Sequence, residues 1–373
     1  MNAELGRKLR ICVTLVVLAG CSSGAAPSSS LVASAAPHQS AAEFIGLSSP
    51  HARTMAMMAM TNAAHRVPRI HSNRGKSWMK PDTALHDLLY VSDQGSNTVD
   101  VYEANRAVPT LYGQLTGFDY PEGDCSDAAG NVYITSYSGS IVEYAHGGTT
   151  PIDSAQSGGN AIGCAYDPTT ANIAVSNHNS NSGSGFVVVF SGGLSGLQIV
   201  YSSDLVSFWP PAYDSSGNLY VEGYTAGGIT VSEAHAGSTS FKDLTLSGGA
   251  INFPGGVVFD GKYIVFSDQK FGGSQNTGFY RTTVSGTTAT VVSSIVLTDT
   301  CFNSYTDIIQ AAVTMRKGSP NGIDGSNIYC SERDENNFEY FNYTTGGNPV
   351  KTIPQDIAPE EGIGQTFSLA AGQ

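Results

Sequence analysis

Short apolar runs recur along the chain from residue 87 onward, and each ends in a small or acidic residue. Runs of this length, bounded by polar turn residues, are typical of buried β-strands. A second strand with alternating apolar and polar positions follows each run, as in Thr98–Tyr102 and Ser140–Tyr144. The six copies of the run are Leu89–Asp93, Val132–Ser136, Ile173–Asn177, Leu219–Gly223, Ile264–Asp268 and Ile328–Glu332.

The spacing of these copies indicates the fold. Successive copies begin 43, 41, 46, 45 and 64 residues apart, close to the roughly 40–50 residues of a four-stranded propeller blade. Several follow an Asp turn, as in Asp127–Asn131 and Asp214–Asn218, which favours a tight hairpin. With 43 Gly, 18 Tyr and 13% charged residues, the composition also suits short strands. The pattern predicts an all-β, six-bladed β-propeller over residues 87–373.

The innermost strand of each blade is expected just before the Asp turn, as in Gly123–Asp127 and Gly163–Asp167. The first blade lacks such a strand, because the chain enters it directly at Asp87. A matching segment occurs near the C-terminus, at Pro359–Gln365. We expect this C-terminal strand to close the first blade, which removes open edges that would otherwise pair with other chains. We therefore expect a monomer.

The N-terminal residues have the features of an export signal. Three basic residues precede the apolar run Ile11–Leu18, which is far shorter than the roughly 20 residues that span a bilayer. Leu18–Cys21 resembles the lipobox of bacterial lipoproteins. The resemblance implies that residues 1–20 are a lipoprotein signal peptide and that Cys21 carries the lipid, including palmitate. An ordinary signal peptide with a chance cysteine is the alternative.

Residues 21–86 are expected to be a lipidated, flexible linker. The part up to residue 50 is rich in Ser, Ala and Pro and has too little large apolar surface to fold by itself. Residues 51–80 are basic and rich in Met, so a short helix or a contact with anionic lipid is an alternative there. No sustained amphipathic period follows, which favours a solvated linker.

The charge of the chain is unevenly distributed. Residues 87–373 contain 9 basic and 28 acidic groups, a formal charge of −19. Such a body repels phosphate backbones, which argues against nucleic acid as a partner. It suits cations or basic partners, and the alternative is that the charge keeps a surface protein soluble.

Four cysteines remain once the signal and Cys21 are set aside. Disulfides persist in exported proteins. Counted from the shared Gly, Cys164 lies one step and Cys125 two steps along the inner strand, so the two side chains point to opposite sheet faces. We predict a Cys125–Cys164 disulfide between neighbouring blades and, by elimination, a Cys301–Cys330 disulfide. Two pairs of buried thiols are the alternative.

One stretch resembles a known group of propellers. Pro121–Gly123, followed by Asp127–Ile134, is similar to the NHL-repeat propellers and the related gluconolactonase-like family. The resemblance extends over residues 87–373 at the level of the fold. Its motifs are typical of propeller blades and specify little of the chemistry of a site.

The gluconolactonase-like resemblance also implies a metal site. These propellers hold one divalent cation in the central channel with oxygen ligands of the kind that Ca²⁺ prefers. Glu122 matches the first ligand motif of the family, and Asn160 opens the next inner strand. Blade four has Trp209–Pro211 and blade five Pro254–Gly256 where later ligands are expected, so the catalytic Asp of the family is not identified. A solvated Glu122 at the start of its strand is the alternative.

The sequence motifs of other chemistries are missing. The Gly-x-Ser-x-Gly pattern occurs once, at residues 20–24, where no strand precedes it, so it is a false match. No HExxH, phosphate-binding glycine loop or haem-attachment motif is present. The histidines of the propeller fall at expected loops and edges, where solvation is the alternative to catalysis.

The last residues of the six apolar runs should lie on one face around the ring axis. Such a ring can bind a cation or a polyhydroxylated ligand, and it can equally be the solvated rim that any propeller has; the sequence does not distinguish the two. The ring comprises Asp93, Ser136, Asn177, Gly223, Asp268 and Glu332.

We therefore expect a non-catalytic propeller, anchored in the bacterial cell envelope outside the cytoplasm, that binds or scaffolds a protein, a glycan or a small ligand. The alternative is a Ca²⁺-dependent, lactonase-like hydrolase with Glu122 and Asn160 at the metal. The sequence specifies neither a catalytic residue nor a certain cofactor.

Overall fold

The computed structural model describes residues 75–373 except 105–109, 179–184, 202, 275, 299–311, 315–326, 333–336, 353–357 and 371–373. All of these residues belong to His38–Gln373, one of two units into which the chain divides. The expected signal peptide and Cys21 lie outside the described residues.

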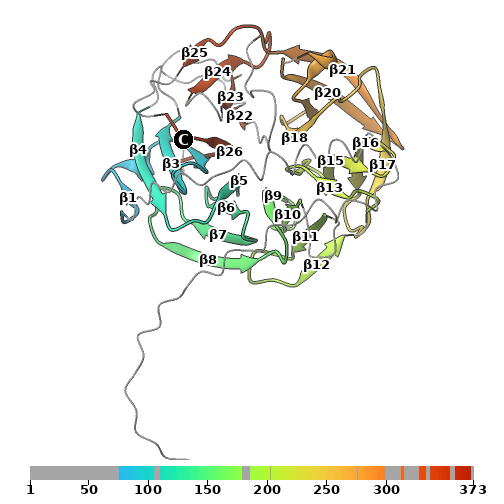
Figure 1. The fold of residues 1–373 in the computed structure, drawn as a ribbon. Coiled ribbons are helices and arrows are strands. Elements are labelled where there is room, and N and C mark those ends of the chain that lie inside the picture. The colour runs from blue at the N-terminus through green and yellow to red at the C-terminus, as the bar shows by residue number, and fades with distance from the viewer. Residues whose placement is uncertain are drawn as a thin grey trace, which may run out of the picture. The chain divides into compact units, whose positions relative to one another are not determined.

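The described strands form six blades around one axis, which confirms the predicted six-bladed β-propeller (Figure 1). Blade one consists of β2 (Leu88–Asp93), β3 (Thr98–Glu103), β4 (Leu111–Thr116), β26 (Gly362–Ser368) and a short outer strand, β1 (Trp78–Met79). Blade two consists of β5 (Pro121–Ser126), β6 (Val132–Ser136), β7 (Ser140–Tyr144) and β8 (Pro151–Gln156). Blade three consists of β9 (Ala161–Tyr166), β10 (Ile173–Asn177), β11 (Phe186–Phe190) and β12 (Gln198–Tyr201).

In the remaining blades the strands follow one another in chain order from the axis outward. Blade four consists of β13 (Ser207–Phe208), β14 (Ala212–Tyr213), β15 (Leu219–Thr225), β16 (Gly228–Ala234) and β17 (Lys242–Ser247). Blade five consists of β18 (Pro254–Phe259), β19 (Ile264–Asp268), β20 (Gly278–Ser285) and β21 (Thr288–Val296). Blade six consists of β22 (Ala312–Thr314), β23 (Asn327–Glu332), β24 (Asn337–Asn342) and β25 (Lys351–Thr352). Two short 3₁₀ helices are described, η2 (Thr83–Leu85) and η3 (Phe271–Gly273).

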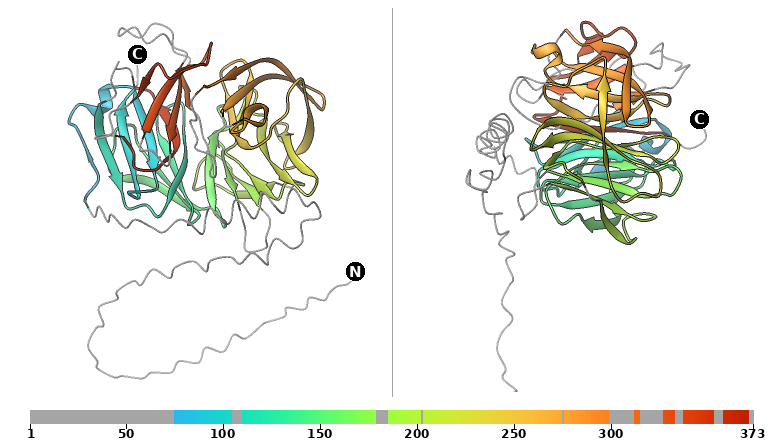
Figure 2. Two further views of the ribbon diagram at one scale, coloured as in Figure 1. Left: turned by 45° about the horizontal axis from the view of Figure 1, so that its top comes forward. Right: turned by 90° about the vertical axis from the view of Figure 1, so that its right-hand side faces the viewer.

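The C-terminal strand closes the ring as predicted. β26 pairs antiparallel with β2, so that Tyr90 lies opposite Thr366 and Leu88 opposite Ser368. Figure 2 shows the blue strands of blade one beside the red strands of blade six. Blade one therefore takes its inner strand from the end of the chain and its other strands from the beginning.

The apolar core lies between neighbouring blades. Leu88 and Tyr90 pack with Val132 of blade two, whereas Leu89 and Val91 pack with blade six. Because successive side chains of a strand point to opposite faces, a strand that is covered on both sides needs an unbroken apolar run. This explains why the runs that define the repeat are continuously hydrophobic.

Two outer features were not expected from the sequence. β17 pairs in parallel with β21, with Thr245 opposite Thr288, which joins blades four and five into one hydrogen-bonded sheet. β1 lies in the expected linker and pairs with β4 of blade one, with Met79 opposite Gly113. Residues of the expected linker therefore pair with the propeller.

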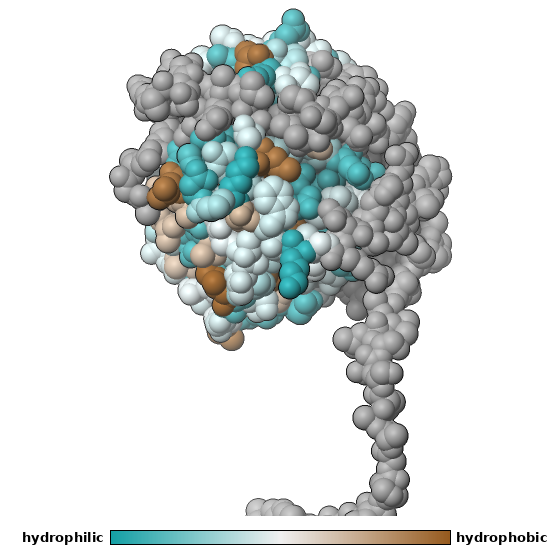
Figure 3. All heavy atoms as spheres, turned by 90° about the vertical axis from the view of Figure 1, so that its left-hand side faces the viewer, coloured by the Kyte–Doolittle hydropathy of each residue, from teal (hydrophilic) through white to brown (hydrophobic). Residues whose placement is uncertain are grey.

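The surface carries scattered apolar residues. On the side of the ring with β1 and β4, hydrophobic residues lie in separate small groups among polar ones (Figure 3). Within the described ranges, no helix has the length and hydrophobicity that crossing a membrane requires.

Candidate functional site

Four of the inner strands have an irregularity close to the point where the next strand of the blade ends. In β26 the extra residue is Ile363, and in β9 it is Ile162. In β5 and β18 the irregularity falls at Glu122–Gly123 and Gly255–Gly256. A bulge re-aims a side chain out of the alternating pattern of its strand. These four bulges therefore direct residues toward the axis or toward the neighbouring blade.

Apolar side chains meet at the ring axis. Ile162 and Ile363 are 0% and 4% exposed and pack against each other. They belong to blades three and one, which are separated by blade two, so their contact must lie on the axis side of the inner strands. Two apolar side chains therefore meet on the axis side of these inner strands.

Glu122 is fully buried at the bulge of β5. Its Oε1 accepts a hydrogen bond from Nε2 of Gln94 in blade one. Asp124, two residues farther along β5, is also fully buried and accepts a hydrogen bond of 2.7 Å from the Ser92 hydroxyl. Burial raises the pKa of Asp124 well above its ordinary value. Both carboxyl groups therefore connect blade two to blade one.

Asn160, the second expected metal ligand, has different neighbours. Its side-chain amide donates to the carbonyl oxygen of Tyr137 at 2.8 Å, and its own carbonyl accepts from the backbone of His178 at 2.9 Å. Among the residues that the structure describes, no group of three or more His, Cys, Asp or Glu is placed to hold a metal ion. Ca²⁺ takes 6–8 oxygen ligands, which include amide and backbone oxygens as well as carboxylates. The calcium site remains a prediction.

The expected ring of polar residues is buried rather than presented to solvent. Asp93, Asn177 and Asp268, here called the clasp residues, are 2%, 0% and 0% exposed. Ser136 is also fully buried, and the side chain of Glu332 lies outside the described ones. The clasp residues end the second strands of blades one, three and five, and we call the face on which they lie the upper face.

Hydrogen bonds show what the clasp residues do. Asp93 accepts bonds from the backbone N–H groups of Gly95, Glu360 and Glu361 at 2.8–2.9 Å. It thereby holds both its own turn and the loop that leads into the closing strand. Asp268 accepts from the backbone of Phe253 at 3.0 Å and from that of Lys270 at 2.9 Å. Asp93 and Asp268 therefore hold these loops to the ends of their own strands.

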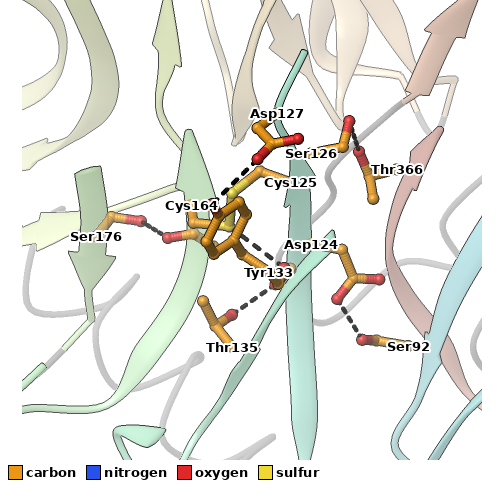
Figure 4. Close-up of a disulfide and its surroundings, with 12 residues drawn as sticks. Ser92, Asp124, Cys125, Ser126, Asp127, Tyr133, Thr135, Cys164, Ser176 and Thr366 are labelled. Atoms are coloured by element: carbon orange, nitrogen blue, oxygen red, sulfur yellow. Dashed lines mark hydrogen bonds between the residues drawn. A yellow bond between two sulfur atoms is a disulfide. The ribbon is translucent and has the colours of Figure 1, made fainter. Parts of the chain in front are cut away.

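The predicted disulfide between blades two and three is present. Cys125 and Cys164 are joined with a Cα–Cα distance of 5.5 Å, and Figure 4 shows the bond between the two inner strands. Both residues are at most 6% exposed. The other expected disulfide, between Cys301 and Cys330, lies outside the described residues and side chains.

Blade four departs from the repeat at the position just before the end of its second strand. Just before the clasp position, the other described blades have hydroxyl side chains, whereas blade four has Glu222. This carboxylate is fully buried and accepts a hydrogen bond of 2.7 Å from the backbone of Gly255 and another from Gly256. Burial raises its pKa well above the ordinary value. The equivalent hydroxyls are those of Ser92, Thr135, Ser176 and Ser267.

The inner strand of blade four is also interrupted. Trp209 follows β13, and two prolines separate it from β14. The backbone N–H of Trp209 donates to the backbone carbonyl of Glu222 at 3.0 Å. The interrupted inner strand is therefore hydrogen-bonded to the residue that replaces the hydroxyl of the other blades. The signal in the sequence was the substitution of Glu for Ser or Thr in one copy of the repeat.

The comparisons with known proteins agree with the fold. No family model matches the chain. No curated protein matches it in sequence. TolB from Acinetobacter baumannii is similar in structure, with a TM-score of 0.52, 14% identity and coverage of 78% of this chain and 68% of that one.

Two proteins of unknown function are similar as well. One, from Desulfotomaculum acetoxidans, has a TM-score of 0.50, 13% identity and coverage of 79% of this chain and 88% of that one. The other, from Bacteroides caccae, has a TM-score of 0.50, 11% identity and coverage of 76% and 99%. At these identities the likeness shows the β-propeller fold alone.

Proposed function

We propose that this protein is a binding or scaffold propeller of the bacterial cell envelope, held there by a lipid on Cys21, that presents one face of the ring to a protein, a glycan or a small ligand. The contact between Ile162 and Ile363 carries the proposal. It places apolar side chains at the axis, where a catalytic Ca²⁺ would need several oxygen ligands. A binding surface suits this arrangement better than a catalytic channel does.

The clasp residues support a role as a platform. Their buried side chains hold the loops of the upper face to the ends of the strands. Binding residues are commonly carried on loops that a rigid scaffold positions. The upper face is therefore the surface that we propose for ligand contact.

The envelope location has two supports, the lipobox-like sequence that ends at Cys21 and the disulfide between Cys125 and Cys164. Disulfides persist mainly in oxidising compartments. Metabolic labelling of a bacterial host with an alkyne analogue of palmitate tests the anchor. We expect label in the wild type and in Cys12→Ser, and no label in Cys21→Ser. Label that persists in Cys21→Ser would contradict the anchor.

The alternative, a Ca²⁺-dependent lactonase-like hydrolase, draws its support from Glu122, which is fully buried at the bulge of β5. Metal analysis, melting curves and lactone hydrolysis with the purified full-length protein separate the two functions. We expect no stoichiometric divalent ion, no hydrolysis and the same Tm with and without Ca²⁺, because a bound ion would stabilise the fold by mass action. An ion that is retained by Glu360→Gln but lost from Glu122→Gln would overturn the binding function.

A further inference from the structure

One histidine contacts both segments of the chain that meet where the ring closes. His146 lies in blade two, in the loop that follows β7. Its Nδ1 lies 2.6 Å from the hydroxyl of Ser368, which ends the closing strand β26. Its Nε2 lies 3.0 Å from the carbonyl oxygen of His86, just before β2. We call these two hydrogen bonds the closure contact, because β2 and β26 are the strands that pair when the ring closes.

Further contacts hold the same segments close together. The backbone N–H of Ala370 donates to Oδ1 of Asp87 at 2.9 Å. A Cβ at Gly130, in the first turn of blade two, would lie only 2.8 Å from the carbonyl oxygen of Leu369. The entry segment, the C-terminal segment and blade two are therefore packed tightly around His146.

The hydrogen atoms of the closure contact depend on the charge of His146. A carbonyl oxygen can only accept, so Nε2 donates to His86 and the neutral ring has its lone pair on Nδ1. Nδ1 then accepts the single proton of the Ser368 hydroxyl, for which the carbonyl oxygen of Gly130 also competes. In the charged ring Nδ1 donates to Ser368, and the hydroxyl proton goes to Gly130. Protonation therefore reverses the hydrogen bond between His146 and Ser368.

The surroundings of the ring favour the neutral form. Burial lowers the pKa of His146 below its ordinary value of 6.5, and this effect outweighs the backbone contacts and the charge of Asp87, which act in the opposite direction. In the entry segment, His86 lies 2.9 Å from Glu103 and 3.5 Å from Asp82. These two carboxylates face His86 and are paired with it.

The other segments around His146 contribute few titratable groups. In blade two they are Asp127 and Glu143, and Asp127 accepts hydrogen bonds from the backbone of its own turn. The closing strand, Gly362–Ser368, contains no acidic or basic residue. His146 is therefore the titratable group that links the closing strand to blade two.

We propose that the closure contact is a pH-dependent fastening of the ring, which the neutral His146 holds and the protonated His146 releases. The closed ring binds the proton of His146 less well than an opened ring does. Closure is therefore most stable above pH 6.5 and is weakened as the pH falls below this value.

The fastening acts on the face that we propose for ligand contact. At its other end, β26 begins at Gly362, opposite Asp93. Asp93 also binds the backbone of Glu360 and Glu361 in the loop that leads into β26. Acid should therefore loosen this loop together with the closing strand. This consequence for ligand contact rests on the proposed function, whereas the fastening itself does not.

Hydrogen–deuterium exchange of the full-length protein at pH 5 and pH 7.5 tests the fastening. The measured rates are corrected for the intrinsic effect of pH, and β15 (Leu219–Thr225) serves as the internal reference for opening of the whole fold. We expect the closing strand to open up to about thirtyfold more at pH 5 relative to β15, because each pH unit below 6.5 counts tenfold. An NMR titration of labelled histidines in the wild type should show His146 titrating below 6.5, with the proton of its neutral form on Nε2.

Two variants separate the fastening from a merely structural contact. His146→Gln has no titratable group at this position and should open to the same extent at both pH values. Ser126→Ala is the matched control, because the Ser126 hydroxyl also binds the closing strand, at the carbonyl oxygen of Phe367 and 2.6 Å away. Since that carbonyl does not titrate, Ser126→Ala should increase opening by the same factor at both pH values and keep the wild-type pH dependence.

Either of two results would overturn the inference. One is that the closing strand of the wild type opens equally at pH 5 and pH 7.5 relative to β15. The other is that His146→Gln keeps the pH dependence of the wild type, which would assign it to another group such as His86. If His146→Gln does not fold, a wild-type titration of His146 at or above 6.5 also refutes the proposal. The lipid-labelling, metal and lactone assays do not depend on these outcomes, so the proposed function is tested separately.

Discussion

Individual buried carboxyl groups connect strands and blades in this propeller. Asp100 lies within β3 and is 6% exposed. Its oxygens accept hydrogen bonds from Gln114 at 2.8 Å and from the Tyr102 hydroxyl at 3.4 Å. Burial and the charge of Asp93 raise the pKa of Asp100 to about 7. A group with this pKa makes the stability of the fold depend on pH near neutrality.

The sign of this dependence follows from proton binding. Between its ordinary value of 3.8 and about 7, Asp100 is protonated in the folded protein and ionised in the unfolded chain, so the free energy of unfolding falls as the pH rises through this window. Asp100→Asn removes the effect and should be more stable than the wild type at pH 8 by on the order of 2 kcal/mol. Melting curves from pH 4 to 9 measure this difference, with exposed Asp119→Asn as the control. Curves that stay parallel for wild type and Asp100→Asn would contradict the prediction.

Single elements follow the repeat closely, with exceptions at the edges of the sheets. The Asp turns are the clearest case, since Asp127 accepts from the backbone of Ala129 and Asn131, and Asp214 from that of Ser216 and Asn218, all at 2.8–3.0 Å. Such turns can be predicted because their hydrogen bonds join residues only two to four positions apart. β1 could not be predicted in this way. Two residues have too little pattern, and their pairing with β4 is decided by a partner more than thirty positions away.

The pairing of β1 with β4 requires a residue without a side chain at position 113. A Cβ at Gly113 would lie 2.0 Å from Met79 Sδ and 2.6 Å from the carbonyl oxygen of Trp78, so Gly113→Ala should displace β1 from β4. We expect faster tryptic cleavage after Lys76 or Lys80 and a change in Trp78 emission, measured in Trp209→Phe. Gly227→Ala, where a Cβ meets only ordinary contacts, should leave both unchanged. Equal cleavage rates in the two variants would mean that β1 does not need Gly113.

Several kinds of contact connect neighbouring blades and so hold the ring together. β26 closes blade one, the disulfide joins blades two and three, Glu222 binds blade five, and β17 pairs with β21. Blades five and six are joined by Arg281, which lies over the ring of Tyr343 at 4.0 Å and donates to its carbonyl oxygen. Each blade can bury its apolar faces only against its neighbours. Loss of one contact between blades therefore lowers the stability of the whole closed ring.

The disulfide provides a test at this scale. It joins residues 39 positions apart, and a loop of this length should contribute about 3–4 kcal/mol to the free energy of unfolding. The double variant Cys125→Ala/Cys164→Ala should lose about this amount in urea titrations. Reductant should lower the stability of the wild type toward that of the double variant and leave the double variant unchanged. Full stability of the wild type in reductant, under conditions that expose the bond, would contradict the prediction.

The sequence alone determined the number of blades, the closing strand and the Cys125–Cys164 pair, because each depends on a repeat or on the two-residue period of a strand. Only the tertiary structure decided which polar residues are buried and what they bind. Asp93 and Asp268 were correctly placed at strand ends, yet their contacts to neighbouring loops depend on how the ring brings those loops together. The contact of Ile162 with Ile363 joins blades that are not adjacent in the ring. Such contacts arise from closure around an axis, which no local period along the chain encodes.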